Sequence, residues 1–287
     1  MGDGESKKRS SMLPAALVVA AVATPACSTL KPFRVSDRPE PKPSPAALRG
    51  AGTSAYLRFA WAREDDYVVR VVAGSVTCSG SLIDDDQVLT AHHCVSQRND
   101  FGEFQSSNVE AKNVHVELGG DYLPWGEVGV RAIVAPPCGY AAGVGDIAIL
   151  VLERKLVGMP TVTPRLDEPP KKGEEIEPVG FGRCALSSDG IRRKERVGGA
   201  VDRVMDSRFR LNAAICPGDS GGPALSTGTG EVIGIISASV MDGKEQTLGR
   251  SEFSRLDRWR PVFAAAKLIA DGTPPAEVPP VDGCEAP

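Results

Sequence analysis

The chain has 287 residues, of which 41% are hydrophobic and 24% are charged, and this balance is typical of a globular protein with one large core or two smaller ones. Its 33 basic and 37 acidic side chains are spread along the sequence and give a formal net charge of -4. No long-range field of one sign therefore points to nucleic acid or to an acidic membrane as a partner, and we expect no nucleic-acid binding.

The first residues have the pattern of an export signal. Basic residues at positions 7–9 precede an apolar run over residues 12–23, which is too short to span a bilayer. We therefore predict a signal peptide over residues 1–26 and an exported protein that is secreted, periplasmic or anchored by lipid at the cell envelope.

The position of signal cleavage stays open between two sites. Ala23 ends the kind of small-x-small stretch that ordinary signal cleavage favours. Cleavage after Ala26 would instead expose Cys27, the odd member of seven cysteines, to lipid attachment, although Thr24 and Pro25 fit a lipid-attachment motif poorly. A lipid anchor at Cys27 is thus one of two alternatives.

Pro-rich segments flank a central body that is built mainly from strands. Residues 27–50 predict a linker or short propeptide, and residues 271–287 predict a Pro-rich tail. The window 255–270 has helical spacing and predicts one C-terminal helix. Strand-like segments ended by turn residues fill the rest of the body: "YVVRVVAG" at 67–74, "VTCSGSLI" at 76–83, "QVLTA" at 87–91, "NVHVELGG" at 113–120, "IAILVL" at 147–152 and "EVIGIISASV" at 231–240.

A serine stands in a glycine-rich turn, "CPGDSGGPAL" at 216–225. Glycines on both sides of Ser220 allow backbone angles that other residues avoid, and such a turn exposes the Oγ atom of the serine. The N–H groups of Gly218 and Ser220 can converge on one point there, as the stabilisation of a carbonyl oxyanion requires. These residue types also make plain turns, so the interpretation as a nucleophile depends on the rest of the chain.

A serine nucleophile needs a base, and the base needs a group that orients it. The stretch "AHHC" at 91–94 supplies two of the three histidines of the chain, and "GDIAIL" at 145–150 places Asp146 at the head of an apolar strand. A partly buried carboxylate at that point can hold an imidazole in one tautomer and stabilise the imidazolium.

Three blocks together resemble the chymotrypsin/trypsin family of serine endopeptidases: "CSGSLIDDDQVLTAHHC", "DIAIL" and "GDSGGP", in the order His, Asp, Ser. The resemblance implies an all-β fold of two packed antiparallel β-barrels, over residues 51–160 and 161–270, with a C-terminal helix. It also implies hydrolysis of peptide bonds without a metal ion or an organic cofactor. We expect a monomer that acts on protein or peptide substrates.

Residue by residue, the resemblance makes His93 the base, Asp146 its orienting group and Ser220 the nucleophile, with the oxyanion donors named above. His92 stands where the family usually has alanine. We interpret it as a structural neighbour, because adjacent side chains of an extended chain point to opposite sides. His115, in an alternating segment, is interpreted as structural too.

Three residues match positions around the substrate-binding pocket of the family. Ser237 stands near the buried aspartate and begins the segment that pairs with the substrate backbone. Ala214 stands where an aspartate selects Arg or Lys, so a buried cation would lack a partner. Ser239 stands where a glycine commonly opens the pocket. We therefore predict a preference for small or medium apolar residues before the cleaved bond.

Six cysteines remain after Cys27, and they can form three disulfides. The resemblance implies the first, which would brace the loop that carries the base. This first disulfide is Cys78–Cys94. Cys216 matches a family cysteine whose usual partner is missing here, so for the other two disulfides we favour Cys184–Cys216 and Cys138–Cys284.

The chain departs from the family pattern at activation. Relatives are cut to expose an Ile-Val-Gly-Gly-like terminus, whose ammonium pairs with the aspartate before the nucleophile, here Asp219. The stretch "LRGAGTS" at 48–54 contains no such motif. A buried carboxylate without a cation is costly, so either an unusual chain terminus or an internal arginine should neutralise Asp219.

The sequence therefore predicts an exported serine endopeptidase. The alternative is a protease-like domain that binds proteins without cutting them. Such domains usually lack part of the catalytic set, whereas the histidine, the aspartate and the serine are all present here.

Overall fold

The computed structural model describes residues 65–120, 123–140, 144–183, 192–241, 247–282 and 284. The predicted signal peptide, the linker over residues 27–50 and Cys184 lie outside these residues. No helix in the described part of the chain is long and apolar enough to cross a membrane.

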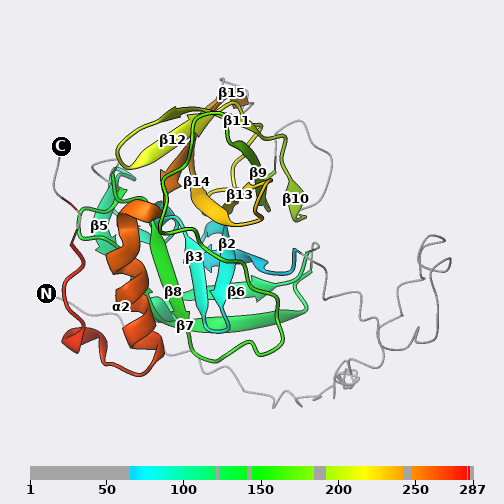
Figure 1. The fold of residues 1–287 in the computed structure, drawn as a ribbon. Coiled ribbons are helices and arrows are strands. Elements are labelled where there is room, and N and C mark those ends of the chain that lie inside the picture. The colour runs from blue at the N-terminus through cyan, green and yellow to red at the C-terminus, as the bar shows by residue number, and fades with distance from the viewer. Residues whose placement is uncertain are drawn as a thin grey trace, which may run out of the picture. The chain divides into compact units, whose positions relative to one another are not determined.

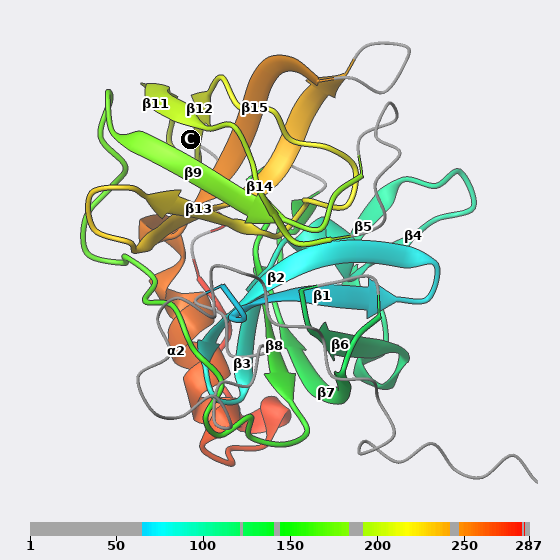
Figure 2. The ribbon, with the colours of Figure 1, turned by 90° about the vertical axis from the view of Figure 1, so that its right-hand side faces the viewer.

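Six strands of the first half close into an antiparallel barrel, in the order β1-β2-β3-β8-β7-β6 (Figures 1 and 2). Buried residues alternate with less buried ones along the strand "VHVEL", as expected when one face of a strand lies on a core. The six strands are β1 (Val68–Ala73), β2 (Val76–Asp84), β3 (Gln87–Thr90), β6 (Val114–Leu118), β7 (Gly126–Val134) and β8 (Ala148–Leu152).

Two short strands and two short helices interrupt the first barrel between β3 and β6. They begin with the 3-10 helix η3 (His92–Cys94), which is followed by the hairpin of β4 (Ser96–Arg98) and β5 (Phe104–Asn108) and by η4 (Ala111–Asn113). The hairpin forms a separate two-stranded sheet, so it projects from the barrel next to His93.

Seven strands form the second sheet, in the order β10-β9-β11-β12-β15-β14-β13, and a further pairing of β9 with β13 closes six of them into a second barrel. The two closed antiparallel barrels confirm the predicted fold class. The seven strands are β9 (Glu175–Gly180), β10 (Lys194–Glu195), β11 (Gly199–Val204), β12 (Arg208–Leu211), β13 (Pro223–Ser226), β14 (Val232–Met241) and β15 (Thr247–Arg255).

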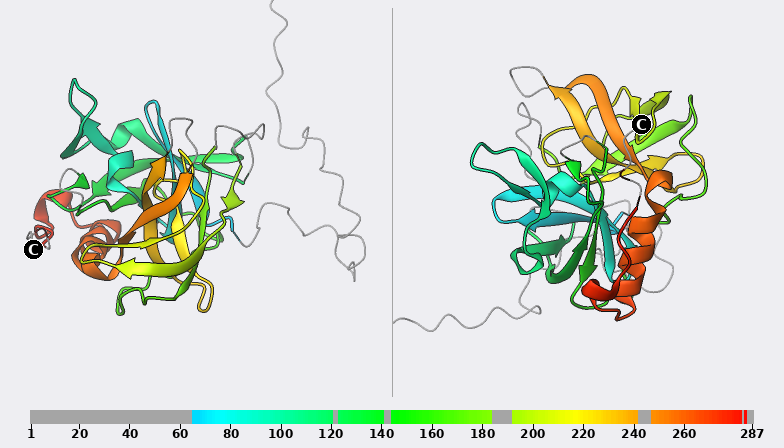
Figure 3. Two further views of the ribbon diagram at one scale, coloured as in Figure 1. Left: turned by 90° about the horizontal axis from the view of Figure 1, so that it is seen from above. Right: turned by 90° about the vertical axis from the view of Figure 1, so that its left-hand side faces the viewer.

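The one α-helix within the described residues, α2 (Arg260–Ala270), follows the second barrel in sequence but packs against β8 and β7 of the first (Figures 1 and 3). Its apolar face, which includes Val262, Ala266 and Ile269, joins the core of the first barrel. All five residues of β8 are buried, because α2 covers the face of β8 that would otherwise meet water.

The helix begins later than the window 255–270 predicts. Arg255 still belongs to β15, and a 3-10 turn, η6 (Asp257–Trp259), leads into α2. Pro261 stands in the first turn of α2, where the missing N–H of proline costs no helical hydrogen bond. The apolar residues 256 and 259 are buried through this turn rather than through the helix itself.

The predicted Pro-rich tail lies against the first barrel over its described residues. It contains a 3-10 turn, η7 (Pro275–Glu277), and Val278 and Val281 pack against the core of that barrel. A disulfide joins Cys284 to Cys138, the partner that we favoured. Two large cores result, one shared by the first barrel, α2, the tail and part of β14, and one inside the second barrel. A third, small cluster consists of Val68, Val179 and Phe181.

Candidate active site

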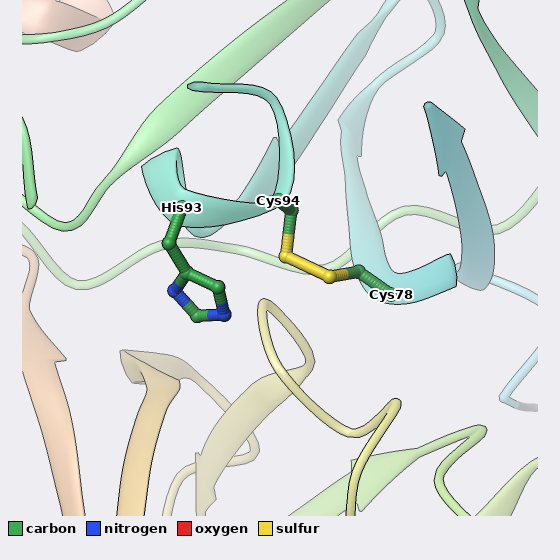
Figure 4. Close-up of side chains that lie close together, drawn as sticks. All are labelled: Cys78, His93 and Cys94. Carbon is green, nitrogen blue, oxygen red and sulfur yellow. A yellow bond between two sulfur atoms is a disulfide. The ribbon is translucent and has the colours of Figure 1, made fainter. Parts of the chain in front are cut away.

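His93 is positioned by η3 at the end of β3. This strand is paired on both sides, with β2 and with β8, and a disulfide joins Cys94 to Cys78 on β2. Figure 4 shows the imidazole of His93 projecting from η3 beside that disulfide. Strand pairing and the covalent link therefore hold the backbone of His93 at a defined place on the barrel.

Asp146 holds the ring of His93 in one orientation. Its carboxylate accepts a hydrogen bond from Nδ1 of His93, 2.9 Å from Oδ2, and another from the backbone N–H of His93, 2.9 Å from Oδ1. Because an ionised carboxylate can only accept, Nδ1 carries the proton and Nε2 keeps its lone pair. The ring can thus take up a proton at Nε2.

Asp146 is ionised although its side chain is only 1% exposed. Burial by itself raises the pKa of Asp146, but the electrostatic interaction with the ring of His93 and hydrogen bonds from His93 and Ser237 lower it by more, so this pKa lies below its usual value. The bond from Ser237 runs from its Oγ to Oδ2 of Asp146. A buried negative charge therefore stands behind the imidazole at neutral pH.

The turn that carries Ser220 is fixed to both barrels. The carbonyl of Ser220 accepts a hydrogen bond from the N–H of Ser79 on β2 at 2.8 Å, and the N–H of Gly221 donates to the carbonyl of Ile236 on β14 at 2.8 Å. Gly221 has a φ of +80°, and a side chain there would collide with Ser79 and Thr90. The turn therefore requires a glycine directly after the serine.

The Ser220 turn also lies next to the disulfide that adjoins His93. Sγ of Cys94 is 3.8 Å from the carbonyl oxygen of Ser220. The structure thus brings together three segments that are far apart in sequence: the turn with the serine, the short helix with His93 and the start of the strand after Asp146.

Ser79 is a residue of this region that the sequence analysis missed. It is fully buried, its Oγ donates to the carbonyl of Gly218 at 2.8 Å, and the same oxygen accepts from the N–H of Phe181 at 2.9 Å. It therefore ties the turn before the serine to β2 and to the segment after β9. Its place directly after Cys78 is the one sequence signal that could have pointed to it.

The N–H groups of Gly218 and Ser220 donate to no other group within the part of the chain that the structure describes. Gly218 has a φ of +97°, a conformation that favours glycine. Both N–H groups are therefore available to an acceptor that approaches the turn.

A sequence model of the family described as Trypsin matches residues 59–259, and this range includes His93, Asp146 and Ser220. The chain belongs to the trypsin family of serine endopeptidases. The match spans both barrels and ends at the start of α2.

Individual relatives are similar at moderate identity. The peroxisomal leader peptide-processing protease of Mus musculus is 29% identical over 176 residues, which make up 61% of this chain but only 28% of the mouse protein. The cercarial protease of Schistosoma mansoni is 28% identical over 210 residues, or 62% of this chain and 76% of that protein. This trypsin-family chain thus corresponds to less than a third of the mouse relative.

A solved structure of Glu endopeptidase in complex with MPD has the same fold. It superposes with a TM-score of 0.56 at 17% identity, over 76% of this chain and 95% of that chain. At this identity the likeness concerns the fold alone, and it agrees with the two barrels described above.

The three residues that we expect near the substrate pocket from the resemblance, Ala214, Ser237 and Ser239, are small and uncharged. Ala214 is partly buried in the segment before the serine. Ser239 on β14 has its Oγ 3.4 Å from Oγ of Ser251 on β15, and Ser251 donates to the carbonyl of Ala213 at 3.0 Å. The sequence analysis missed Ser251. The hydroxyl of Ser237 is directed at Asp146 and is therefore committed to the carboxylate.

Two aromatic side chains pack against His93. The ring centroid of Tyr140 lies 5.3 Å from that of His93, the ring of Phe104 on β5 lies 5.6 Å away, and the two rings are 4.9 Å apart from each other. The guanidinium of Arg98 on β4 lies 4.4 Å over the ring of Phe104. This aromatic cluster, which the sequence did not reveal, covers one side of the imidazole and limits its rotation.

His92 is fully buried, as a structural role requires, but the reasoning from extended chain was wrong. Residues 92–94 form a turn of 3-10 helix, in which successive side chains point about 120° apart rather than to opposite faces. His115 on β6 is partly exposed, with its Nε2 atom 3.8 Å from a carboxylate oxygen of Glu117.

A group of three potential metal ligands lies at the site, because Cys78, His93 and Cys94 have donor atoms within 4.8 Å of one another. The two sulfurs are joined in a disulfide, so neither is a thiolate (Figure 4). Nδ1 of His93 is occupied by Asp146. Metal binding by cysteine needs the thiolate. These residues therefore do not fit a metal centre.

Proposed function

We propose that this protein is an exported endopeptidase in which Ser220 is the nucleophile, His93 the general base and Asp146 the group that orients the base. The contact between Nδ1 of His93 and the buried carboxylate of Asp146 supports this most strongly, because it leaves Nε2 as a proton acceptor in the region of the Ser220 turn.

In the proposed acylation step, Nε2 of His93 takes the proton of the Ser220 hydroxyl while Oγ attacks the carbonyl carbon of the substrate. The N–H groups of Gly218 and Ser220 stabilise the oxyanion that forms. The imidazolium then protonates the leaving amine, the C–N bond breaks, and an ester to Ser220 remains. His93 next takes a proton from a water molecule while the water oxygen attacks the ester carbonyl. The imidazolium then returns this proton to Oγ of Ser220 as the ester C–O bond breaks, which releases the carboxylic acid product and restores the free serine.

The proposed preference for a small or medium apolar residue before the cleaved bond is supported by Ala214, Ser239 and Ser251. A cationic side chain beside them would lose hydration, and none of these three described residues offers it a negative charge. Reporter peptides with Ala or Val at this position should be cleaved with a kcat/KM at least about tenfold above that of matched Arg and Lys peptides. Efficient cleavage after Arg or Lys would contradict the preference.

Export is supported by two disulfides, Cys78–Cys94 and Cys138–Cys284, because such bonds persist in oxidising compartments. A signal peptide over residues 1–26, a linker over 27–50, a lipid anchor at Cys27 and a monomeric state remain parts of the proposal. Mass spectrometry of the mature N-terminus distinguishes a cut after residue 23 from a lipidated cysteine.

Labelling with a fluorophosphonate tests the proposed nucleophile. The purified, folded protein should take up one probe per molecule at Ser220, as mapped by tandem mass spectrometry, and Ser220→Ala should take up none. Absence of label on folded protein would favour the alternative, a protease-like domain that binds proteins without cutting them.

A further inference from the structure

The side chain of Asp219, directly before the proposed nucleophile, is 0% exposed. A carboxylate taken fully out of water needs a cation inside the protein. The sequence leaves two sources open, a chain terminus or an internal arginine. The structure contains the second: Nη2 of Arg196 lies 2.8 Å from Oδ1 of Asp219, and the side chain of Arg196 is itself only 9% exposed.

Four donors already occupy the carboxylate of Asp219. Oδ1 accepts from Nη2 and Nε of Arg196, at 2.8 and 3.1 Å, and from the N–H of Gly182 at 2.7 Å, while Oδ2 accepts from the N–H of Cys216 at 2.8 Å. A carboxylate offers about four lone-pair positions. A side-chain carbon added at Gly180 or Gly182 would also collide with Asp219. Oδ1 is thus saturated and closely packed, and the cation that the buried carboxylate needs is already supplied from within the described residues.

A second buried ion pair fixes the segment that carries Arg196. Residues 192–196, which we call the arginine strap, contain β10 and pair with β9. Nη2 of Arg193 lies 2.6 Å from Oδ1 of Asp66, with both side chains at most 6% exposed, and its Nη1 donates to the carbonyl of Val68. Since Val68 begins β1, the strap joins the first barrel to the carboxylate behind the proposed nucleophile.

Asp219 in turn shapes the loop that contains the proposed oxyanion donors. Its carboxylate accepts from the N–H of Cys216, and its own N–H donates to the carbonyl of Cys216 at 3.0 Å, so two bonds close the loop around Gly218. Burial raises the pKa of Asp219 above its usual value, against the effect of Arg196. Without the arginine, the carboxyl would lose the charge that holds this loop together.

We propose that Arg196 is a positioning residue for the Ser220 turn, and that the arginine strap assembles this turn without a newly cut chain terminus. The uncut chain is therefore already reactive. This inference rests on the proposed role of Ser220, and it adds that reactivity does not depend on where the chain begins.

The first test uses the full chain with its N-terminus intact, as verified by its intact mass, and the fluorophosphonate probe. Labelling of Ser220 should proceed within about twofold of the rate of the naturally processed protein. Labelling that appears only after a proteolytic cut would overturn the inference while leaving the proposed function in place. If neither form reacts although both are folded, the proposed function fails, and the inference fails with it.

The second test replaces the cation. Arg196→Met should slow labelling by about 10²-fold or more, as the loss of an oxyanion donor does, and Arg196→Lys should recover part of the rate because it restores a positive charge. Arg165→Met is the matched control. This variant removes the ion pair of Arg165 with Glu174, in which Nη1 lies 2.7 Å from Oε1 in the segment between the barrels. The pair is nearly as buried, since the side chains of Arg165 and Glu174 are 11% and 14% exposed.

The control should lower the unfolding temperature but leave the labelling rate of folded protein unchanged. Equal labelling of Arg196→Met and the unchanged chain, or equal losses in Arg196→Met and Arg165→Met, would overturn the positioning role. Asp66→Asn keeps Arg196 and removes only the ion pair between Asp66 and Arg193 of the arginine strap. This variant replaces Arg196→Met as the test if Arg196→Met does not fold. It should slow labelling less than Arg196→Met, and a rate equal to that of the unchanged chain would contradict the role of the strap.

Discussion

The backbone N–H of Tyr140 donates a hydrogen bond to Nδ1 of His92 at 3.1 Å, and Nε2 of the same ring lies 2.9 Å from Oδ1 of Asn108. Nδ1 therefore accepts and Nε2 donates, so the ring is neutral and both nitrogens are satisfied. Burial holds the pKa of His92 below its usual value of 6.5, although Asn108 and Asp146 act in the opposite direction.

This arrangement makes stability depend on pH. Below pH 6.5 the unfolded chain binds a proton at His92 that the folded protein does not bind, so the free energy of unfolding should fall as the pH drops. The slope from this one group is at most about 1.4 kcal/mol per pH unit. Denaturant titrations of the unchanged protein and of His92→Gln between pH 7.5 and 5 check this. The variant should have the shallower slope, and identical slopes would contradict the assignment.

The two adjacent histidines should differ in their effect on catalysis. His93→Ala removes the proposed base and should lower kcat by at least about 10⁴-fold. His92→Gln should retain most of the turnover per folded molecule, because its ring bonds to Asn108 and Tyr140. Turnover of the reporter peptide, normalised to the folded fraction, is the measurement. A loss in His92→Gln with activity retained in His93→Ala would reassign the base.

The glycine after the serine should tolerate no side chain. Gly221→Ala places a carbon against Ser79 and Thr90 at a φ of +80° and should abolish labelling of Ser220. Gly230→Ala is the control, since Gly230 has a similar φ of +74° but nothing within 4 Å of the added carbon. The control should cost about 1–2 kcal/mol of stability and leave labelling unchanged. Full labelling of Gly221→Ala would mean that the turn has another conformation.

The disulfide of the C-terminal segment should serve stability rather than catalysis. Replacing Cys138 and Cys284 together by serine should lower the free energy of unfolding by about 2–5 kcal/mol, because the bond closes a loop across a sequence separation of 146 residues. Thermal and denaturant unfolding measure this loss. The labelling rate of the folded variant should stay that of the unchanged chain, and a lower rate would link the segment to the site.

Motifs whose chemistry needs fixed residue types at fixed spacing were readable in the sequence. The block around Cys78 and Cys94, the aspartate before β8 and the glycine-rich turn are local patterns, and the contact between His93 and Asp146 is present in the structure. The conformation of residues 92–94 was not readable, because a single turn of 3-10 helix has no periodic signal.

Contacts that depend on the path of the chain were also hidden. Arg196 is one of 33 basic residues and stands 23 positions before Asp219, with no pattern that links the two. Phe104 and Tyr140 meet His93 because a hairpin and a loop fold back over η3. Ser79 differs from these, since its neighbour Cys78 belongs to a readable motif, but its bond to Gly218 spans 139 positions.

The packing of α2 and the C-terminal segment on the first barrel has a consequence for biosynthesis. Leu256, Trp259 and Phe263 belong to the same core as β1 and β8, and Cys284 closes a disulfide to Cys138. The first barrel therefore lacks part of its core and one of its covalent bonds until residues 256–284 have been synthesised. Although a nascent chain usually folds from its N-terminal domain onward, the first barrel is completed here by residues that are made after the second barrel.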